Sequence, residues 1–205
     1  MTLWGETLMI AKYDSSGNLL KRTNAGASNS IKGNAVSVSP DGNIFITGRI
    51  RWDDIWTARI SPSFSIIWEN TYNGTANGWN DNGLGIALDS KTNVLIAGTS
   101  EETGNYNDIF LRKFAPDGGI QFTKLYNHSS SNDYGYDVTT DSADNIYLVG
   151  YVYDTLQNFD IFIRKYDSTG NEIWTKFYNT EKGSDDEAKS VDVDNSGNVY
   201  VVGTV

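Results

Sequence analysis

Short runs of alternating apolar and polar residues recur along this chain, and Gly, Asn or Asp interrupts them about every ten residues. Alternation with a period of two is the pattern of a strand that buries one face. One type of run reads NAVSVS (34–39), LGIALD (84–89), YDVTTD (136–141) and KSVDVD (189–194). Because apolar positions never keep a three-four spacing for long, the sequence predicts an all-β fold without helices.

These runs belong to a repeat of roughly fifty residues, a period typical of propeller-like arrays. A second type of run follows each first one and ends in glycine: IFITG (44–48), VLIAG (94–98), IYLVG (146–150) and VYVVG (199–203). Third and fourth types complete the unit, as in IFIRKYD (161–167) followed by EIWTKFYN (172–179). Four strands per unit predict a β-propeller blade, which buries both faces of its sheet against its neighbours.

The order of the runs predicts three whole blades and one divided blade. The chain opens on a run of the third type and stops after one of the second type. We therefore expect a single domain, 1–205, with blades at 33–73, 83–127 and 134–179, and a fourth blade made of 187–205 plus 1–26. Joining the ends within one chain would give a four-bladed ring, whereas joining two chains would give an eight-bladed homodimer. The sequence leaves both alternatives open.

Four segments carry a resemblance to a known family: YDSSGNLL (13–20), YDSTGNEIW (166–174), VDVDNSGNVYVVGT (191–204) and IALDSKTNVLIAGTS (86–100). They resemble the SBBP-type β-propeller repeat of bacteria and archaea. The resemblance implies a repeat found mainly in surface and secreted proteins, with no shared catalytic residues, and so an extracellular or cell-surface location. One departure is Lys21, which stands where the other repeats have Trp68, Phe122 and Trp174.

Charge and composition narrow the function further. The formal net charge is −10, and the basic residues are scattered singly, so nucleic acid and anionic membranes are poor partners. The chain has no cysteine, which excludes disulfides, thiolate metal sites and Cys nucleophiles. The first residues, MTLWGETLMIAKYD, do not follow the pattern of a signal peptide, and no apolar run approaches about twenty residues, so we expect no membrane insertion.

The long loops of a propeller of this kind gather on one face, and they carry aromatic and amide side chains here. Aromatic rings beside hydrogen-bonding groups can stack on sugars and bind their hydroxyls. The alternative is that the rings cover the blade packing at its rim. The candidate ligand-binding residues are Trp4, Trp52, Trp79, Tyr106, Tyr134, Tyr153 and Phe159, with Asp53, Asn80 and Asp81.

Signals for metal binding or catalysis are weak. The spacing of Glu101 and Glu102 does not favour calcium, and Asp194 lies where every other repeat has a plain hairpin. His128 is the single histidine, and the serines beside it are typical of a turn. We therefore predict no catalytic residue, no metal ligand and no cofactor. Asp54, Asp108 and Asp160 recur before the third strand and predict a hydrogen bond inside each blade.

The sequence thus favours a non-enzymatic propeller module that binds or assembles, with a protein or a glycan as the partner. One alternative is a carbohydrate-active hydrolase or lyase that uses loop carboxylates. Another is a structural repeat scaffold without a ligand.

Overall fold

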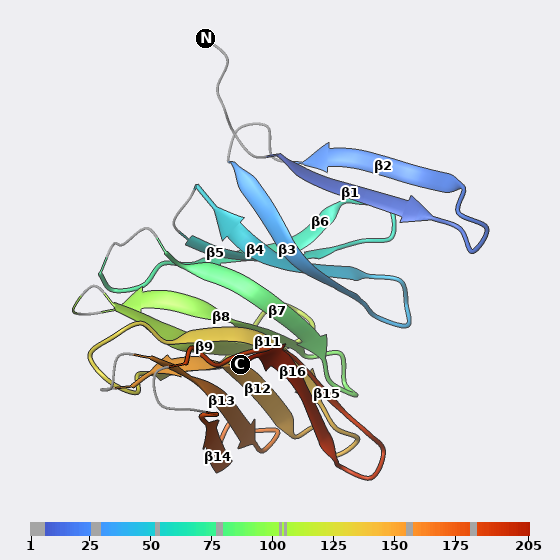
Figure 1. Cartoon of the computed structure of the whole chain (residues 1–205). Helices are drawn as coiled ribbons and strands as arrows, with labels where there is room; N and C mark the ends of the chain where they lie inside the picture. Colours follow the sequence, from blue (N-terminus) through green and yellow to red (C-terminus); the bar gives the residue numbers. More distant parts are fainter. Residues whose placement is uncertain are drawn as a thin grey trace.

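The structure is a computed structural model that describes residues 7–25, 30–51, 54–76, 80–102, 104, 106–154, 158–180 and 184–205. Every regular element in these ranges is a β-strand, so the all-β prediction is confirmed, and no helix that could span a membrane is found there. The sixteen strands (Figure 1) are β1 (Leu8–Tyr13), β2 (Leu19–Ala25), β3 (Ile31–Val38), β4 (Ile44–Ile50), β5 (Asp54–Ile60), β6 (Ile66–Tyr72), β7 (Asn82–Leu88), β8 (Val94–Glu102), β9 (Tyr106–Phe114), β10 (Ile120–Tyr126), β11 (Tyr134–Thr140), β12 (Ile146–Tyr153), β13 (Phe159–Tyr166), β14 (Glu172–Tyr178), β15 (Glu187–Val193) and β16 (Val199–Thr204).

Three antiparallel four-stranded sheets form the middle of the molecule, and each has its strands in chain order: β3–β6, β7–β10 and β11–β14. A two-stranded sheet lies at either end, β1–β2 before them and β15–β16 after them. Figure 1 shows the five sheets following one another in an arc, which is a propeller-like arrangement.

The two terminal hairpins do not form a common blade. The sequence allowed 187–205 and 1–26 to join within one chain, but β1–β2 and β15–β16 are separate sheets at opposite ends of the arc (Figure 1). Each hairpin packs on its own neighbouring sheet, and this packing fixes its direction in space. Because the intervening sheets do not turn far enough to bring β1 beside β16, the four-bladed ring is not closed in this structure.

Packing between neighbouring sheets builds the core as a series of layers. Phe45 and Ile55 of the β3–β6 sheet pack on Phe110 and Phe114 of the next sheet, and Trp68 covers the edge of this layer. A similar layer joins the β7–β10 and β11–β14 sheets, with Leu95, Ile109, Leu111, Leu148 and Phe162 almost fully buried. The hydrophobic core therefore lies between blades rather than within one.

The glycine that ends each second run lies against a β-bulge. In each first strand the pairing register shifts by one residue, for example between Gly83 and Gly85. The strand opposite places Gly98 there, and a Cβ on Gly98 would collide with the backbone carbonyl of Asn82. The same collision holds for Gly48, Gly150 and Gly203. The repeat keeps this glycine because the bulge leaves no room for a side chain.

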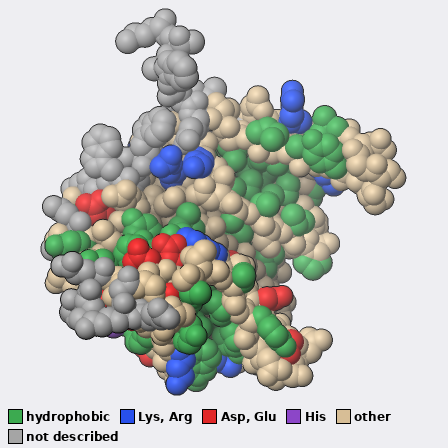
Figure 2. All heavy atoms as spheres, viewed as in Figure 1, with side chains coloured by type: hydrophobic (Ala, Val, Ile, Leu, Met, Phe, Trp, Pro, Cys, Tyr) green, Lys and Arg blue, Asp and Glu red, His purple; other side chains and the backbone are tan. Residues whose placement is uncertain are grey.

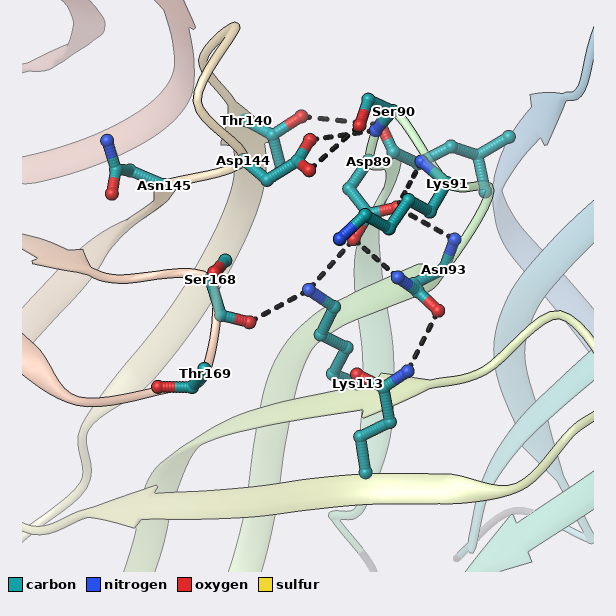
Figure 3. A network of polar contacts seen from close by, with 12 residues as sticks. Asp89, Ser90, Lys91, Asn93, Lys113, Thr140, Asp144, Asn145, Ser168 and Thr169 are labelled. Atoms are coloured by element: carbon teal, nitrogen blue, oxygen red, sulfur yellow. Dashed lines mark hydrogen bonds and ion pairs between the residues drawn. The ribbon is translucent and has the colours of Figure 1, made fainter.

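A buried ion pair links the β7–β10 sheet to its neighbour (Figure 3). Lys113 Nζ lies 2.8 Å from Asp89 Oδ2, and both side chains are almost fully buried. Lys113 Nζ also donates to the carbonyl of Ser168 in the next sheet at 2.9 Å. Burial would raise the pKa of Asp89, but hydrogen bonds from Lys113 and Asn93 outweigh that effect and hold it below its usual range. The pair therefore stays charged and connects two blades.

We expect Gly98→Ala to lower the free energy of unfolding by about 1–3 kcal/mol, because the methyl group forces the bulge at Asn82 to move. Gly119→Ala is the matched control, since its nearest neighbour would be the carboxylate of Asp117 at 3.2 Å. Urea unfolding of both variants measures the difference. Equal losses for the two variants would contradict this role of the bulge.

We expect Lys113→Met to lower the free energy of unfolding by about 3–5 kcal/mol, because it leaves the carboxylate of Asp89 buried without its cation. Lys165→Met is the matched control: it removes a looser pair with Asp141, at 3.6 Å and partly exposed, and should cost about 1 kcal/mol. Urea unfolding at neutral pH compares them. A loss at Lys113 no larger than at Lys165 would contradict the prediction.

Candidate functional site

A cavity of about 220 Å³ opens among the long loops, where three successive sheets meet. Its lining comes from the end of β4, the loop before β7, the starts of β7 and β11, and β8. Figure 2 shows acidic and basic side chains close together near the middle of this side of the molecule. The lining residues are Arg49, Asn80, Asp81, Asn82, Leu84, Thr99, Tyr134 and Tyr136.

Aromatic rings continue from this cavity along the neighbouring ends of β11, β12 and β13. The ring of Tyr134 stacks on Tyr151 at 5.1 Å between centroids, and Tyr151 lies 4.4 Å from Phe159. Tyr153 meets Phe159 edge-on at 5.6 Å, and Tyr136 lies 5.8 Å from Tyr151. These five rings form one cluster, which we call the tyrosine cluster.

Polar contacts hold the exposed end of the tyrosine cluster in place. Asn107 Nδ2 donates to Tyr134 Oη at 2.6 Å, and Lys189 Nζ lies 3.9 Å from the centroid of the Tyr136 ring. Burial raises the pKa of Tyr134, so its hydroxyl stays protonated at neutral pH. On the other side of the cavity, Asn34 Nδ2 donates to Asn82 Oδ1 at 2.6 Å. The cavity wall therefore presents fixed rings and fixed amides.

The structure brings some of the predicted ligand-binding residues together and leaves others apart. Tyr134, Tyr153 and Phe159 lie in the tyrosine cluster, and Asn80 lines the cavity. Tyr106 is exposed at the start of β9 and takes no part in the cluster. Trp4, Trp52, Asp53 and Trp79 lie outside the described residues.

Sequence analysis missed Tyr136 and Tyr151 as members of the cluster. Tyr136 opens a regular alternating strand and was assigned to the sheet, while Tyr151 directly follows the glycine that ends its run. The available signal was an aromatic residue on either side of Gly135, because strand pairing sets Tyr134 opposite Tyr151.

Buried carboxylates organise the long loops. Asp81 is 1% exposed, and its two oxygens accept from the backbone N–H groups of Gly74 and Glu101. Asp133 holds the same place one blade later, where it accepts from the N–H groups of His128 and Tyr153. Asp81 thus lines the cavity while its carboxylate is committed to closing a loop, which the sequence pattern did not reveal.

The hydrogen bond predicted before each third strand is confirmed in two blades. Asp108 accepts from Asn127 at 2.6 Å, and Asp160 accepts from Asn179 at the same distance. In each case the amide follows the fourth strand of the same sheet.

The single histidine does not meet a serine and a carboxylate in the order that a triad requires. The hydroxyl of Tyr126 lies 3.1 Å from His128 Nδ1, and Asp133 binds the backbone of His128 rather than its ring. Ser129 donates its hydroxyl to the carbonyl of Tyr153. Over the described ranges, no group of three or more His, Asp or Glu side chains could hold a metal ion.

Comparison with known proteins supports the repeat and the fold. Residues 121–151, which run from β10 to β12, match the family model for the SBBP beta-propeller repeat, so the resemblance is confirmed over this stretch. No curated protein matches the chain.

Two solved structures share the fold. A protein of unknown function from Bacteroides caccae aligns with a TM-score of 0.59 and 8% identity, over 96% of this chain and 65% of that one. A gluconolactonase from Xanthomonas campestris aligns with a TM-score of 0.52 and 12% identity, over 94% of this chain and 61% of that one. The chain therefore spans less than two thirds of the length of either, and at such identities the likeness shows the propeller-like fold alone.

Proposed function

We propose that this chain is a non-enzymatic binding module that recognises a glycan through the cavity beside the tyrosine cluster. The observation that carries the proposal is the pairing of Tyr134 and Tyr136 with the amides of Asn80 and Asn82 around one opening. Sugar rings have apolar faces that stack on aromatic rings and hydroxyls that bind amides.

The size of the cavity favours one sugar unit of a longer glycan. Its volume of about 220 Å³ lies below the range of about 300–1,000 Å³ that is usual for pockets enclosing drug-sized ligands. The cluster extends from Tyr136 through Tyr151 to Phe159 and Tyr153. Tyr151 is buried beneath this row, but the partly exposed rings of Tyr153 and Phe159 offer a surface for neighbouring units of the same glycan.

The roles of three loop carboxylates, Asp81, Asp133 and Glu102, favour binding over hydrolysis. A general acid or base must reach the substrate with a carboxyl group that is not already committed. The carboxylates of Asp81 and Asp133 already accept hydrogen bonds from backbone N–H groups. The carboxylate of Glu102 accepts hydrogen bonds from the side chains of Tyr72, Ser100 and Thr75. The gluconolactonase neighbour supports a shared fold and adds no residue to this site.

An oligosaccharide array tests this function. We expect the chain to bind a subset of neutral or acidic oligosaccharides, and Tyr136→Ala to weaken that binding about tenfold by removing the stacking ring. Tyr106→Ala is the control, because Tyr106 is an exposed tyrosine at the start of β9 that lies outside both the cavity and the tyrosine cluster. Calorimetry with the best oligosaccharide measures both variants.

Three outcomes would contradict the glycan proposal. The array could show no binding, Tyr136→Ala could bind as well as the unchanged chain, or the best oligosaccharide could be cleaved during incubation. Cleavage would favour the hydrolase or lyase instead.

The structural role of Asp133 predicts a pH dependence of stability. Burial raises the pKa of Asp133 to about 6, above its unfolded value, so its contribution is present below pH 4 and is lost as the pH rises through 6. We expect the free energy of unfolding to fall by about 1–2 kcal/mol from pH 5 to pH 7, and Asp133→Asn to reduce this slope.

Urea unfolding at pH 5, 6 and 7 measures the slope. The unchanged chain and Asp133→Asn are compared at each pH, so that any titration common to both cancels in the difference. Asp192→Asn serves as the control, since it removes an exposed carboxylate from β15. An unchanged slope in Asp133→Asn would contradict the assignment.

A further inference from the structure

Two strands at the ends of the arc each have one edge unpaired within the described residues. In every complete sheet the second strand pairs with the third: β4 with β5, β8 with β9 and β12 with β13. By repeat position β16 is a second strand and β1 is a third strand, yet they lie in separate sheets. Each edge therefore lacks the strand type that the other provides.

Burial at these edges departs from the rest of the repeat. Met9 and Tyr13 of β1 are 57% and 59% exposed, whereas Phe110 and Phe114, at the same positions of β9, are 0% and 1% exposed. Tyr200 and Val202 of β16 are 60% and 65% exposed, whereas their counterparts, Leu95 and Ala97, are fully buried. Side chains that the repeat normally buries are open at both ends.

Charge is complementary across the same two edges. Lys12 holds the repeat position of Lys113 and Lys165, and Asp194 holds that of Asp89 and Asp141. In the complete blades these positions form the pairs Lys113–Asp89 and Lys165–Asp141. Lys12 is exposed, and no ion pair joins it to a carboxylate in the described part of the chain.

Tyr200, which lies near Asp194, makes the same hydrogen bond as its counterpart in a complete blade. Tyr200 Oη donates to Asp194 Oδ2 at 3.1 Å, as Tyr147 Oη donates to Asp141 Oδ2 at 3.0 Å. In the complete blade Lys165 Nζ also lies 4.8 Å from the Tyr147 ring centroid. The β16 edge therefore has the acceptor and the ring of this arrangement in place.

An apolar groove accompanies each edge. One, of about 260 Å³, lies between β1 and β3 and is lined by Leu8, Met9, Ile10 and Val36; Figure 2 shows the molecule hollowed there, with apolar side chains on its walls. The other, of about 540 Å³, lies beside β16 and is lined by Ile161, Phe177, Tyr178 and Val201. Within the arc, Phe110 fills the corresponding place beside Ile55 and lies 4.9 Å from the ring of Tyr72.

We propose that β16 of one copy pairs antiparallel with β1 of a second copy and so completes a four-stranded blade. The register of the complete blades sets Gly203 opposite the partner's Met9, Val201 opposite the partner's Ala11 and Val199 opposite the partner's Tyr13. The partner's Lys12 then meets Asp194 and Tyr200, and the partner's Met9 enters the groove beside Ile161 and Tyr178.

A second copy is the occupant because the strand type, the charge and the groove all match this chain's own other end. The intrachain arrangement keeps the two edges apart (Figure 1). We call the pairing of β16 with the partner's β1 the joint. Two joints related by a twofold axis close two copies into a ring, whereas joints without such closure extend the copies into an open array. The interaction is independent of the proposed glycan site, which lies on the long loops.

Light scattering coupled to size exclusion, over a hundredfold range of concentration, tests the joint. We expect masses of two or more copies of the 22.7 kDa chain, with the monomer fraction falling as concentration rises. Lys12→Glu should raise the concentration needed for association at least about tenfold, because it places two carboxylates at the buried joint. Lys12→Arg should associate normally, since Arg59 holds this position in the β3–β6 sheet.

Lys91→Glu is the matched control, because it makes the same change of charge at an exposed hairpin away from both edges. Circular dichroism and urea unfolding confirm that each variant is folded. A strict monomer at all concentrations would overturn the proposal, and so would association that Lys12→Glu leaves unchanged. Another protein or a longer chain at these edges would give the first result.

Discussion

Each of the three four-stranded sheets in this protein has another sheet packed against each of its faces. The core residues of one blade, such as Phe45 and Ile55, complete their burial only on Phe110 and Phe114 of the next. A single four-stranded blade would leave both faces exposed to water, so blades are stable in series rather than alone. The ion pair of Lys113 and Asp89, with the bond from Lys113 to the carbonyl of Ser168, adds a polar link between two members of that series. Repetition of this packing between sheets produces the arc. The arc in turn determines where the loops at its rim lie.

Much of the fold can be predicted from the sequence because the repeat encodes local constraints. The glycine of each second strand marks a place where a bulge excludes a side chain, and Asp108 and Asp160 mark a bond within the blade. The position of the two terminal hairpins relative to each other cannot be predicted in this way. It sums small rotations over all the junctions, and no single residue determines that sum. For that reason the sequence left open whether the two halves of the divided blade meet within one chain, and in the structure they lie apart.

The candidate site was predictable only in part for a related reason. Aromatic residues in loops are visible in the sequence, but a ring inside a regular strand, such as Tyr136, looks like core. The bulge near Gly135 changes which face the strand presents at its start, so that Tyr136 reaches the cavity. Asp81 shows the reverse error, because a loop carboxylate that seems free for a ligand is bound to two backbone N–H groups. Local hydrogen bonding, rather than residue type, separates the two cases.

The same repeat positions have different energetic value inside the arc and at its ends. At an internal junction Lys113 and Asp89 are shielded from water, so their attraction is strong and the loss of either is costly. At the same positions of the end strands, Lys12 is exposed and Asp194 is only half-buried, so water weakens any attraction between charges there. The attraction between these two charges becomes strong only when a strand covers them and excludes water. In the proposed pairing, a strand of a second copy covers Lys12 and Asp194, and their attraction then gains the strength that the same pair has inside the arc.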